Sequence, residues 1–197
     1  MSLLIMIRHG LTEWNIDHRL QGHADLPLSD DGRRQVQSWR LPDKFLRYRW
    51  LTSPLRRAVE TATLLKGEAP PADERLKEMS WGRWEGYTVD DLRAELGDAM
   101  RENEMRALDF QPPEGESPRQ VQTRLWPLLD EIFVAGDPVV AVTHKGVMRA
   151  VYAEAVGWNM LGKPPHKMED GVAQVYEIGP GGRPLRLAEI IELEAAE

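Results

Sequence analysis

Two short apolar runs, far apart in the chain, have the pattern of strands buried on both faces of a sheet. The first is Leu3-Leu4-Ile5-Met6-Ile7, and the second is Pro138-Val139-Val140-Ala141-Val142-Thr143. Neither run alternates between apolar and polar residues, which is typical of strands inside a parallel sheet. Each ends abruptly in polar residues, Arg8-His9-Gly10 in one case and His144-Lys145-Gly146 in the other. Open α/β sheets bind ligands at the carboxyl ends of their strands, so these residues are candidates for one site.

Helical periodicity in the other segments predicts helices that pack on this sheet. Ser29 is a predicted N-cap, followed by Asp30 and Asp31 in the first turn. Ser53-Pro54 predicts another helix start directly after a short strand at 48–52, with Ser53 as N-cap, and Ser117-Pro118 predicts a third. In the last two of these helices, apolar residues recur at helical spacing and form a stripe that would face the sheet.

Two further segments complete the predicted organisation. Residues 90–108 have a strongly charged helical pattern that breaks near Gly97, and we interpret them as a cap over the active face. The segments 172–178 and 185–191 flank a Gly- and Pro-rich turn, which predicts a hairpin that closes the sheet. The Pro- and Gly-bearing loop 111–117 is too short for an interdomain linker. We therefore expect a single domain over residues 1–197, with a cap-like helical segment at about 88–116.

Composition and charge narrow the class of protein. The chain has 197 residues, a formal net charge of -7 and no cysteine, so disulfides, thiol nucleophiles and zinc-thiolate sites are excluded. The negative charge argues against nucleic acid or an anionic membrane as a partner. The N-terminal apolar run is too short for a signal peptide and no stretch could span a membrane, so we expect a cytoplasmic protein. The tail hairpin could be a dimer edge or a covered edge, which leaves monomer and homodimer open.

Arg56 is the candidate for anion binding outside the two buried strands. It is predicted to lie in the first turn of a helix that follows a strand. There, free backbone N–H groups, the positive end of the helix dipole and a guanidinium group would act together on an anion. Arginine is otherwise unfavourable near a helix N-terminus, which favours a functional role. Gln21 could reach the same site from the loop at 21–28, whereas His23 is interpreted as a surface histidine.

The segment 74–86 mixes acidic residues with tryptophans and glycines and has no clean periodicity. Such a segment is expected to be a loop packed over the edge of the sheet, and packed loops often carry function. A carboxylate beside tryptophan has its pKa raised by desolvation, which suits a general acid. Glu78 and Glu85 are both candidates, and the residues alone do not decide between them.

Two histidines, two arginines and one glutamate together support phosphoryl transfer. A neutral imidazole can attack phosphorus and carry the phosphoryl group. Arg8, Arg56 and a protonated His144 could hold the phosphoryl oxygens without a metal. A carboxylic acid such as Glu78 could protonate the leaving alkoxide and then activate water. Since no Asp/Glu cluster of magnesium-ligand character accompanies these residues, we expect neither a metal nor another cofactor.

Short motifs follow one another over nearly the whole chain in an order typical of one known family. They are Arg8-His9-Gly10-Leu11-Thr12-Glu13-Trp14-Asn15, Gln21-Gly22, Asp25-Leu26-Pro27-Leu28 with Gly32, Ser53-Pro54-Leu55-Arg56-Arg57-Ala58 with Thr61-Ala62, Leu76-Lys77-Glu78, Gly82-Arg83-Trp84-Glu85-Gly86, Gly115-Glu116-Ser117 and Thr143-His144. Together they resemble the motifs of the histidine phosphatase superfamily, the phosphoglycerate mutase-like proteins of branch 1.

The resemblance implies a fold and a set of site residues. The fold would be a three-layer α/β/α sandwich whose sheet is mostly parallel, with one antiparallel edge strand. The expected catalytic residues are the nucleophile His9, the proton donor Glu78, and Arg8, Arg56 and His144. Glu85 would then be structural. Contacts to the phosphoryl group are expected from Thr12, Asn15 and Gln21. Lys145 stands where many relatives have glycine, and its ammonium group either adds to the pocket or points away from it.

We expect a metal-independent phosphomonoesterase of the histidine acid phosphatase type, acting on a small phosphorylated metabolite. A cofactor-dependent phosphoglycerate mutase is the alternative within the family. Mutases of the family carry a longer insertion between the proton donor and the second histidine, whereas Glu78 and His144 enclose one modest cap. A non-catalytic module that binds phosphoesters is the alternative from another class, but such a module is expected to lack the nucleophile or the donor. The substrate stays open among sugar phosphates, phosphoglycerates, nucleotide-derived phosphates and phosphoproteins.

Overall fold

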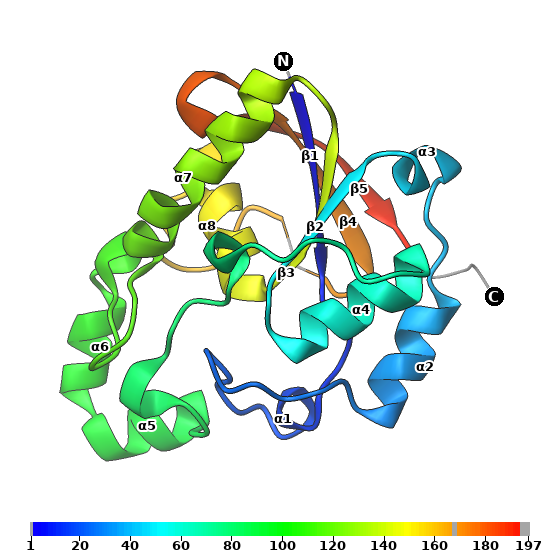
Figure 1. The fold of residues 1–197 in the computed structure, drawn as a ribbon. Helices are drawn as coiled ribbons and strands as arrows, with labels where there is room; N and C mark the ends of the chain where they lie inside the picture. The colour runs from blue at the N-terminus through cyan, green and yellow to red at the C-terminus, as the bar shows by residue number, and fades with distance from the viewer. Residues whose placement is uncertain (1, 167–168, 194–197) are drawn as a thin grey trace.

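The computed structural model describes residues 2–166 and 169–193 (Figure 1). Along the chain the strands and α-helices are β1 (Ser2–Arg8), α1 (Glu13–Ile16), α2 (Asp30–Ser38), α3 (Asp43–Leu46), β2 (Arg49–Thr52), α4 (Arg56–Lys66), α5 (Val89–Leu96), α6 (Asp98–Glu104), α7 (Pro118–Ala135), β3 (Val139–Thr143), α8 (Lys145–Val156), β4 (Val172–Ile178) and β5 (Pro184–Glu192). Short 3-10 turns occur at Glu74–Leu76, Gly82–Trp84, Ala107–Asp109 and Pro180–Gly182. Among these residues, no helix combines the length and apolar character needed to cross a lipid bilayer.

The strands form a mixed sheet in the order β2-β3-β1-β4-β5. β2, β3 and β1 pair in parallel, and β4 pairs antiparallel with both β1 and β5. The α/β class and the mostly parallel sheet are confirmed. The antiparallel strand, however, is β4, which lies between β1 and β5 and is therefore not the edge strand. The predicted tail hairpin exists and pairs with β1 through its first strand, so its second strand, β5, becomes the edge.

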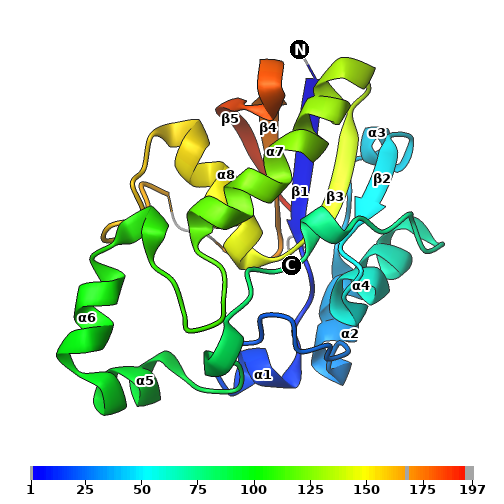
Figure 2. The same cartoon turned by 60° about the vertical axis from the view of Figure 1, so that its left-hand side comes forward.

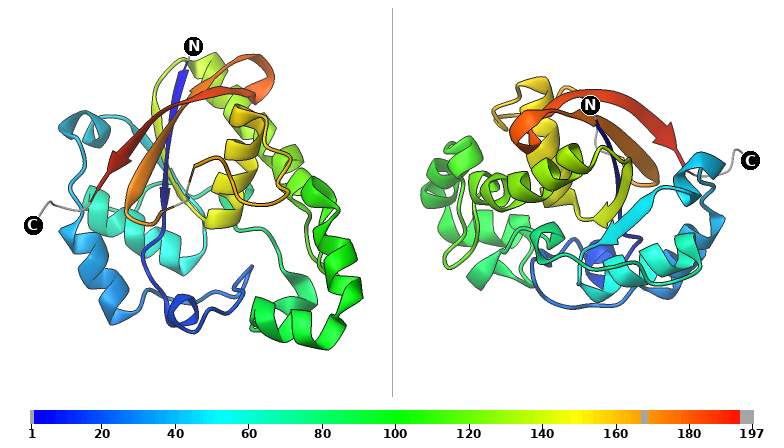
Figure 3. Two further views of the ribbon diagram at one scale, coloured as in Figure 1. Left: turned by 180° about the vertical axis from the view of Figure 1, so that it is seen from behind. Right: turned by 45° about the horizontal axis from the view of Figure 1, so that its top comes forward.

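Side chains of β1 alternate between two cores, one on each face of the sheet. Leu4 and Met6 pack with the buried faces of α7 and α8, whereas Ile5 and Ile7 pack with α2 and α4. These side chains are fully buried. Helices therefore cover both faces of the sheet, which makes three layers (Figure 3). This double burial explains why the strand reads as an unbroken apolar run rather than an alternating one.

Two of the three predicted helix starts are confirmed. The Ser29 hydroxyl accepts a hydrogen bond from the Gly32 N–H at 3.0 Å, and Ser117 forms a capping box with Gln120 at the start of α7. The start at Ser53 is wrong by two residues, because α4 begins at Arg56 and has no side-chain cap. The Ser53 N–H instead donates to the Val142 carbonyl at 2.9 Å, which holds this residue beside β3 directly after the end of β2.

The segment predicted to be a cap contains α5 and α6, which are separated at Gly97 as expected. Gly97 has φ 54° and ψ -120°, a conformation that favours glycine. Both helices lie beyond the carboxyl ends of β1 and β3 and away from the sheet (Figures 1 and 2). Their buried residues Leu92 and Met100 pack in a small separate core with Trp84.

The segment that follows β1 is held by hydrogen bonds from two helical regions. The Gly10 N–H donates to the Thr61 hydroxyl of α4 at 3.0 Å, and the Leu11 N–H donates to the Gln35 side chain of α2 at 3.2 Å. The Leu11 carbonyl accepts from the Ser29 N–H at 2.9 Å. The backbone around His9 is therefore fixed by α2 and α4 as well as by the sheet.

Replacing Gly32 tests this anchoring. A Cβ at Gly32 would lie 2.0 Å from the Leu11 carbonyl oxygen, so Gly32→Ala must push α2 away from the segment that follows β1. We expect the free energy of unfolding to fall by about 1–3 kcal/mol, measured by urea denaturation. Gln37→Ala, at an exposed position of the same helix, is the control and should change it by less than about 0.5 kcal/mol. Equal losses in the two variants would contradict the anchoring.

Candidate active site

The register of β1 and β3 brings the two predicted histidines together. Arg8 pairs with Thr143 in the parallel ladder, and the His9 N–H donates to the Thr143 carbonyl at 3.0 Å. Both strands therefore end at the same level, and the rings of His9 and His144 lie 5.0 Å apart between centroids. His9 is 5% exposed and His144 is fully buried.

Hydrogen bonding and burial together define the state of the His9 ring. Nδ1 lies 2.7 Å from the Gly10 carbonyl oxygen, which can only accept, so Nδ1 carries the proton. Burial lowers the pKa of His9 well below its ordinary value, and the neighbouring charges of Arg8 and Arg57 lower it further. The ring is therefore neutral near pH 7, and its unprotonated nitrogen is Nε2.

Burial also determines the state of the His144 ring. Burial lowers its pKa well below the ordinary value, and Arg57, His9 and Arg8 add to this effect, so the neutral ring is favoured. Nε2 lies 2.7 Å from the Ser53 hydroxyl, and buried Nδ1 has no hydrogen-bond partner among the described residues. Protonation of His144 was expected for the state that holds a phosphoryl group, so it stays a prediction for that state. A dianion bound beside the ring would act in the opposite direction.

The structure brings Arg57, not Arg56, to the histidines. Arg56 is exposed and forms a 3.8 Å ion pair with Glu60 of its own helix. It is not among the residues that line the pocket next to His9. Arg57 is fully buried, lines the pocket, and donates to the carbonyls of Ala24 and Gly22 at 2.7 and 2.8 Å. The structure therefore favours Arg57 over the predicted Arg56. Both arginines lie in the first turn of α4, so the first-turn argument for Arg56 does not distinguish them, and only the directions of the two side chains do.

Arg8 lies where the sequence predicted it. Its guanidinium forms an ion pair with Asp170, and its side chain is 15% exposed. Arg8 lines the same pocket as His9 and Arg57, and its Nε has no hydrogen-bond partner among the described residues. The guanidinium therefore keeps donor capacity for an anion bound next to His9.

Glu78 reaches the pocket from the loop that follows the 3-10 turn Glu74–Leu76, and backbone N–H groups orient its carboxylate. One oxygen accepts from the Met79 N–H at 2.8 Å, and the other accepts from the Gly146 N–H at 3.2 Å. A Cβ at Gly146 would lie 2.4 Å from the carboxylate, so glycine allows this close approach to the first turn of α8. Of the two candidate acids, Glu78 is the one that lines the pocket.

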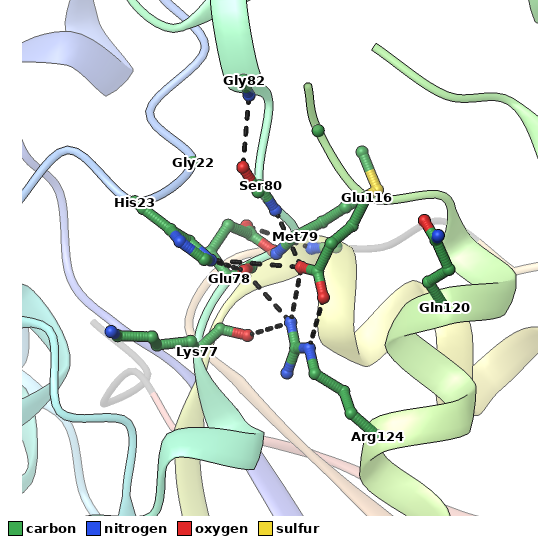
Figure 4. A network of polar contacts seen from close by, with 12 residues as sticks. Gly22, His23, Lys77, Glu78, Met79, Ser80, Gly82, Glu116, Gln120 and Arg124 are labelled. Atoms are coloured by element: carbon green, nitrogen blue, oxygen red, sulfur yellow. Dashed lines mark hydrogen bonds and ion pairs between the residues drawn. The ribbon is translucent and has the colours of Figure 1, made fainter. Parts of the chain in front are cut away.

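An ion pair between Arg124 of α7 and Glu116 holds the backbone that carries Glu78 (Figure 4). The Arg124 guanidinium donates to the carbonyls of Lys77 and Glu78 at 2.8 and 3.1 Å, and to both carboxylate oxygens of Glu116. Glu116 also accepts from the Ser80 N–H at 3.0 Å. The backbone on both sides of Glu78 is thus tied to α7. Arg124 is a positioning residue that sequence analysis missed.

The loop at 21–23 completes this wall of the pocket. His23 is exposed, as a surface histidine would be, but its Nε2 donates to the Glu78 carbonyl at 2.9 Å, so it also supports the site. Glu85 accepts from the His23 N–H at 2.7 Å and lies against Gly22, which has φ +51°. Glu85 therefore supports the loop. Gln21 is buried and lines the pocket, and its Oε1 has no partner among the described residues.

The remaining predicted contacts divide between the pocket and its support. Thr12 is fully buried and is not among the residues that line the pocket. Its backbone N–H and its hydroxyl both donate to the Asn15 side-chain oxygen at 3.0 Å. Asn15 lines the pocket, and because its oxygen is occupied, its amide NH₂ group is the part that can reach an anion. Lys145 also lines the pocket.

The pocket that contains these groups has a volume of about 670 Å³. Beyond the histidines its wall becomes largely apolar, with Trp81, Met105, Phe110, Met160 and Leu161. The segment with α5 and α6 adds Arg93, Arg101 and Glu104 to the same wall. Within residues 2–166 and 169–193, no group of three or more His, Cys, Asp or Glu side chains is arranged to hold a metal ion.

Comparison with known proteins gives consistent matches over most of the chain. The sequence model of the histidine phosphatase superfamily (branch 1) matches residues 4–190. A glucosyl-3-phosphoglycerate phosphatase of Mycolicibacterium vanbaalenii is 36% identical over 81% of this chain and 78% of its own length. A 2,3-bisphosphoglycerate-dependent phosphoglycerate mutase of a Methylobacterium species is 31% identical over 89% and 91%. The solved structure of mycobacterial hydrolase 1 has a TM-score of 0.81 at 28% identity, over 98% and 99% of the two chains.

These matches remove one reason for preferring a phosphatase over a mutase, namely the short segment between Glu78 and His144. The mutase relative is covered over 91% of its length by 89% of this chain, so the two proteins have similar sizes. Chain length therefore does not separate the two activities, and the distinction must come from the pocket.

Separate replacement of each of the two adjacent arginines tests which one belongs to the site. We expect Arg57→Gln to weaken the binding of inorganic phosphate by about 10-fold or more, because it removes a buried cation beside His9. Arg56→Gln should change the affinity by less than about 2-fold, since an exposed ion pair contributes little. Isothermal titration calorimetry measures both. A larger loss in Arg56→Gln than in Arg57→Gln would contradict the assignment.

Acid stability tests the ion pair that holds Glu78. Although burial opposes ionisation, hydrogen bonds from Arg124 and the Ser80 N–H hold the pKa of Glu116 below its ordinary value. Such a carboxylate stabilises the folded state above its unfolded pKa, about 4.3, and this stabilisation is lost as pH falls through the lower folded pKa. The difference in unfolding free energy between wild type and Glu116→Gln should therefore be largest near neutral pH and shrink below about pH 4.5.

Glu114→Gln is the matched control for that experiment. Glu114 pairs with Arg83, and its side chain is 64% exposed, so solvent screens the pair. Its removal should change the stability little at any pH. A pH-independent difference for Glu116→Gln would show that Glu116 contributes by packing and not by its charge.

Proposed function

The chain belongs to branch 1 of the histidine phosphatase superfamily and is an enzyme of phosphatase type, and we propose that it hydrolyses a small phosphomonoester through a phosphate carried on His9. One observation carries the mechanism. The hydrogen bond of His9 Nδ1 to the Gly10 carbonyl leaves Nε2 as the unprotonated nitrogen of a neutral, buried imidazole. Such a nitrogen is a nucleophile, whereas an imidazolium is not.

In the first step Nε2 of His9 attacks phosphorus in line with the ester oxygen, and the P–O bond to the alcohol breaks. Arg8 and Arg57 stabilise the charge on the equatorial oxygens, and Asn15 and Gln21, which line the same pocket, donate to these oxygens through their amide NH₂ groups. A bound phosphoryl dianion favours protonation of His144, because opposite charges stabilise each other in a buried site. His144 then donates to the same group.

Glu78 acts as the general acid in the first step and as the general base in the second. As a carboxylic acid it protonates the leaving alkoxide, and the alcohol departs. The resulting carboxylate removes a proton from the water that attacks the phosphohistidine. Inorganic phosphate is released, and His9 and the protonated Glu78 are restored. The backbone N–H donors of Met79 and Gly146 orient the carboxylate, and the ion pair of Arg124 and Glu116 supports the backbone that carries it.

Hydrolysis is favoured over transfer to a second hydroxyl by the size of the pocket. A volume of about 670 Å³ is in the range of sites for much larger ligands than phosphoglycerate. A three-carbon acid bound at His9 would leave room for water, which intercepts the phosphohistidine. We propose that the segment 88–116 acts as a cap that selects the alcohol part of the substrate. The relative that is 31% identical is a mutase, so mutase activity is the second candidate.

We propose that this enzyme acts in the cytoplasm on a soluble metabolite, as a monomer or homodimer. Its net charge of -7 disfavours nucleic acid and anionic membranes, while the local cations of the pocket attract a small anion. A non-catalytic binding module is disfavoured because His9 and Glu78 line one pocket together with Arg8 and Arg57, and the ring of His144 lies 5.0 Å from that of His9.

Phosphate release from a panel of phosphomonoesters tests the activity. The panel includes 3-phosphoglycerate, a sugar phosphate and a nucleotide-derived phosphate, with and without EDTA. We expect release that survives EDTA and falls by at least about 10³-fold in His9→Ala, as for loss of a nucleophile. Formation of 2-phosphoglycerate from 3-phosphoglycerate without phosphate release would instead establish a mutase. Binding of phosphate without any turnover would establish a binding module.

The leaving group tests the role of Glu78. An alkyl phosphate needs protonation of its leaving oxygen, whereas p-nitrophenyl phosphate has a leaving group that departs without it. We expect Glu78→Gln to lower the rate of phosphohistidine formation about 10²- to 10⁴-fold for an alkyl phosphate and much less for p-nitrophenyl phosphate. Rapid-quench measurement of the first turnover isolates this step. Equal losses for both esters would exclude Glu78 as the proton donor.

A further inference from the structure

The cations on the pocket wall differ in whether the protein already supplies them with an oxygen partner. Most of them are bound in this way: Arg8 by Asp170, Arg19 by the Gly86 carbonyl, Arg57 by the carbonyls of Gly22 and Ala24, Arg93 by Glu104 and Arg101 by Asp98. Lys145 and Arg149 line the same pocket but make no hydrogen bond or ion pair within the part of the chain that the structure describes. Their charges are available to a ligand.

Arg149 is fixed in place although it has no oxygen partner among the described residues. Its guanidinium lies over the ring of Trp158, 5.1 Å from the centroid. Trp158 is 8% exposed, and its indole N–H donates to the Leu161 carbonyl at 3.0 Å, so the stacking surface is itself held. Arg149 is half-buried, which removes part of its hydration. A guanidinium that is oriented, partly desolvated and unpaired is favourably positioned to bind an anion.

Lys145 and Arg149 lie one helical turn apart on α8, so both side chains project from the same face of the helix. The rise between them is about 6 Å along the axis. Lys145 follows His144 directly, which puts it at the end of the pair nearer to the phosphoryl group. The walls beyond them include Met160 and Leu161, which reduce competition from water.

We propose that Lys145 and Arg149 form a second anion subsite, which binds a carboxylate or a second phosphate on the alcohol part of the substrate. This inference rests on the proposed function, since it takes the first phosphoryl group to lie at His9. His9, Lys145 and Arg149 line the same pocket, so one small molecule can reach both sites. The substrate class is therefore a phosphomonoester with a second negative group on its alcohol part, and not a neutral sugar or a phosphoprotein side chain.

A matched pair of esters tests the subsite. 3-Phosphoglycerate and glycerol 3-phosphate have the same phosphorylated three-carbon chain, but the second compound has a neutral hydroxymethyl group in place of the carboxylate. We expect wild type to prefer 3-phosphoglycerate in kcat/KM. In Arg149→Met the value for 3-phosphoglycerate should fall about 10- to 100-fold, as for loss of a charged hydrogen bond, while that for glycerol 3-phosphate changes less than about 3-fold. Comparison of fructose 1,6-bisphosphate with fructose 6-phosphate reports whether a second phosphate is accepted.

Two control variants separate a subsite from general effects. Arg183→Met removes the same charge from a guanidinium that lies over a tryptophan ring, 5.2 Å from the Trp126 centroid, but outside this pocket, and it should leave the preference between the two esters unchanged. Arg149→Lys should restore part of the preference. Because the preference is a ratio within one protein sample, partial unfolding of a variant does not alter it. An equal effect of Arg149→Met on both esters would overturn the proposal.

Binding to His9→Ala gives a readout that does not depend on turnover. Calorimetry with this variant should show tighter binding of 3-phosphoglycerate than of glycerol 3-phosphate, and Lys145→Met or Arg149→Met in the same background should remove the difference. If the preference in binding is present while wild type releases no phosphate from any ester, the subsite stands and the proposed hydrolysis fails. If wild type hydrolyses both esters equally and binds them equally, the hydrolysis stands and the subsite fails.

Discussion

Parallel pairing of β1 with β3 is the contact on which the candidate active site depends. The ladder runs from Leu4 and Val139 to Arg8 and Thr143, so the two strands leave the sheet at the same level. A shift of one residue would turn every side chain of β1 to the opposite face of the sheet and would move His9 away from Thr143. The ladder and the hydrogen bond from the His9 N–H to the Thr143 carbonyl at 3.0 Å hold the observed register, which fixes the distance between His9 and His144.

Burial of the two histidines determines the chemistry. Desolvation keeps both imidazoles neutral by lowering the pKa of each, and the charges of Arg8 and Arg57 act in the same direction. In the proposed mechanism a bound phosphoryl dianion favours the protonated form of His144 but leaves the tautomer of His9 unchanged, since Nδ1 of His9 donates to a carbonyl of its own chain. One buried pair of identical side chains can therefore supply a nucleophile and a cationic donor. Their hydrogen-bond partners, not their positions in the sheet, make them different.

Features encoded in local sequence could be predicted, and features that depend on helix phase or distant contacts could not. The buried strands, the caps at Ser29 and Ser117, and the meeting of His9 with His144 all follow from local patterns. The choice of Arg56 is contradicted by its exposed position, because the first turn of α4 contains both Arg56 and Arg57 and the sequence pattern did not show which side chain enters the pocket. Arg124 contacts residues more than forty positions away in the sequence, so no local pattern indicates its role.

Identification of the phosphorylated atom tests the central claim most directly. After rapid mixing with a phosphomonoester, acid-labile phosphate on the protein would be mapped to a residue by mass spectrometry and to a ring nitrogen by ³¹P NMR. We predict phosphate on Nε2 of His9, because Nδ1 is held by the Gly10 carbonyl. Phosphate on Nδ1 of His9, on His144 or on no histidine at all would contradict this mechanism.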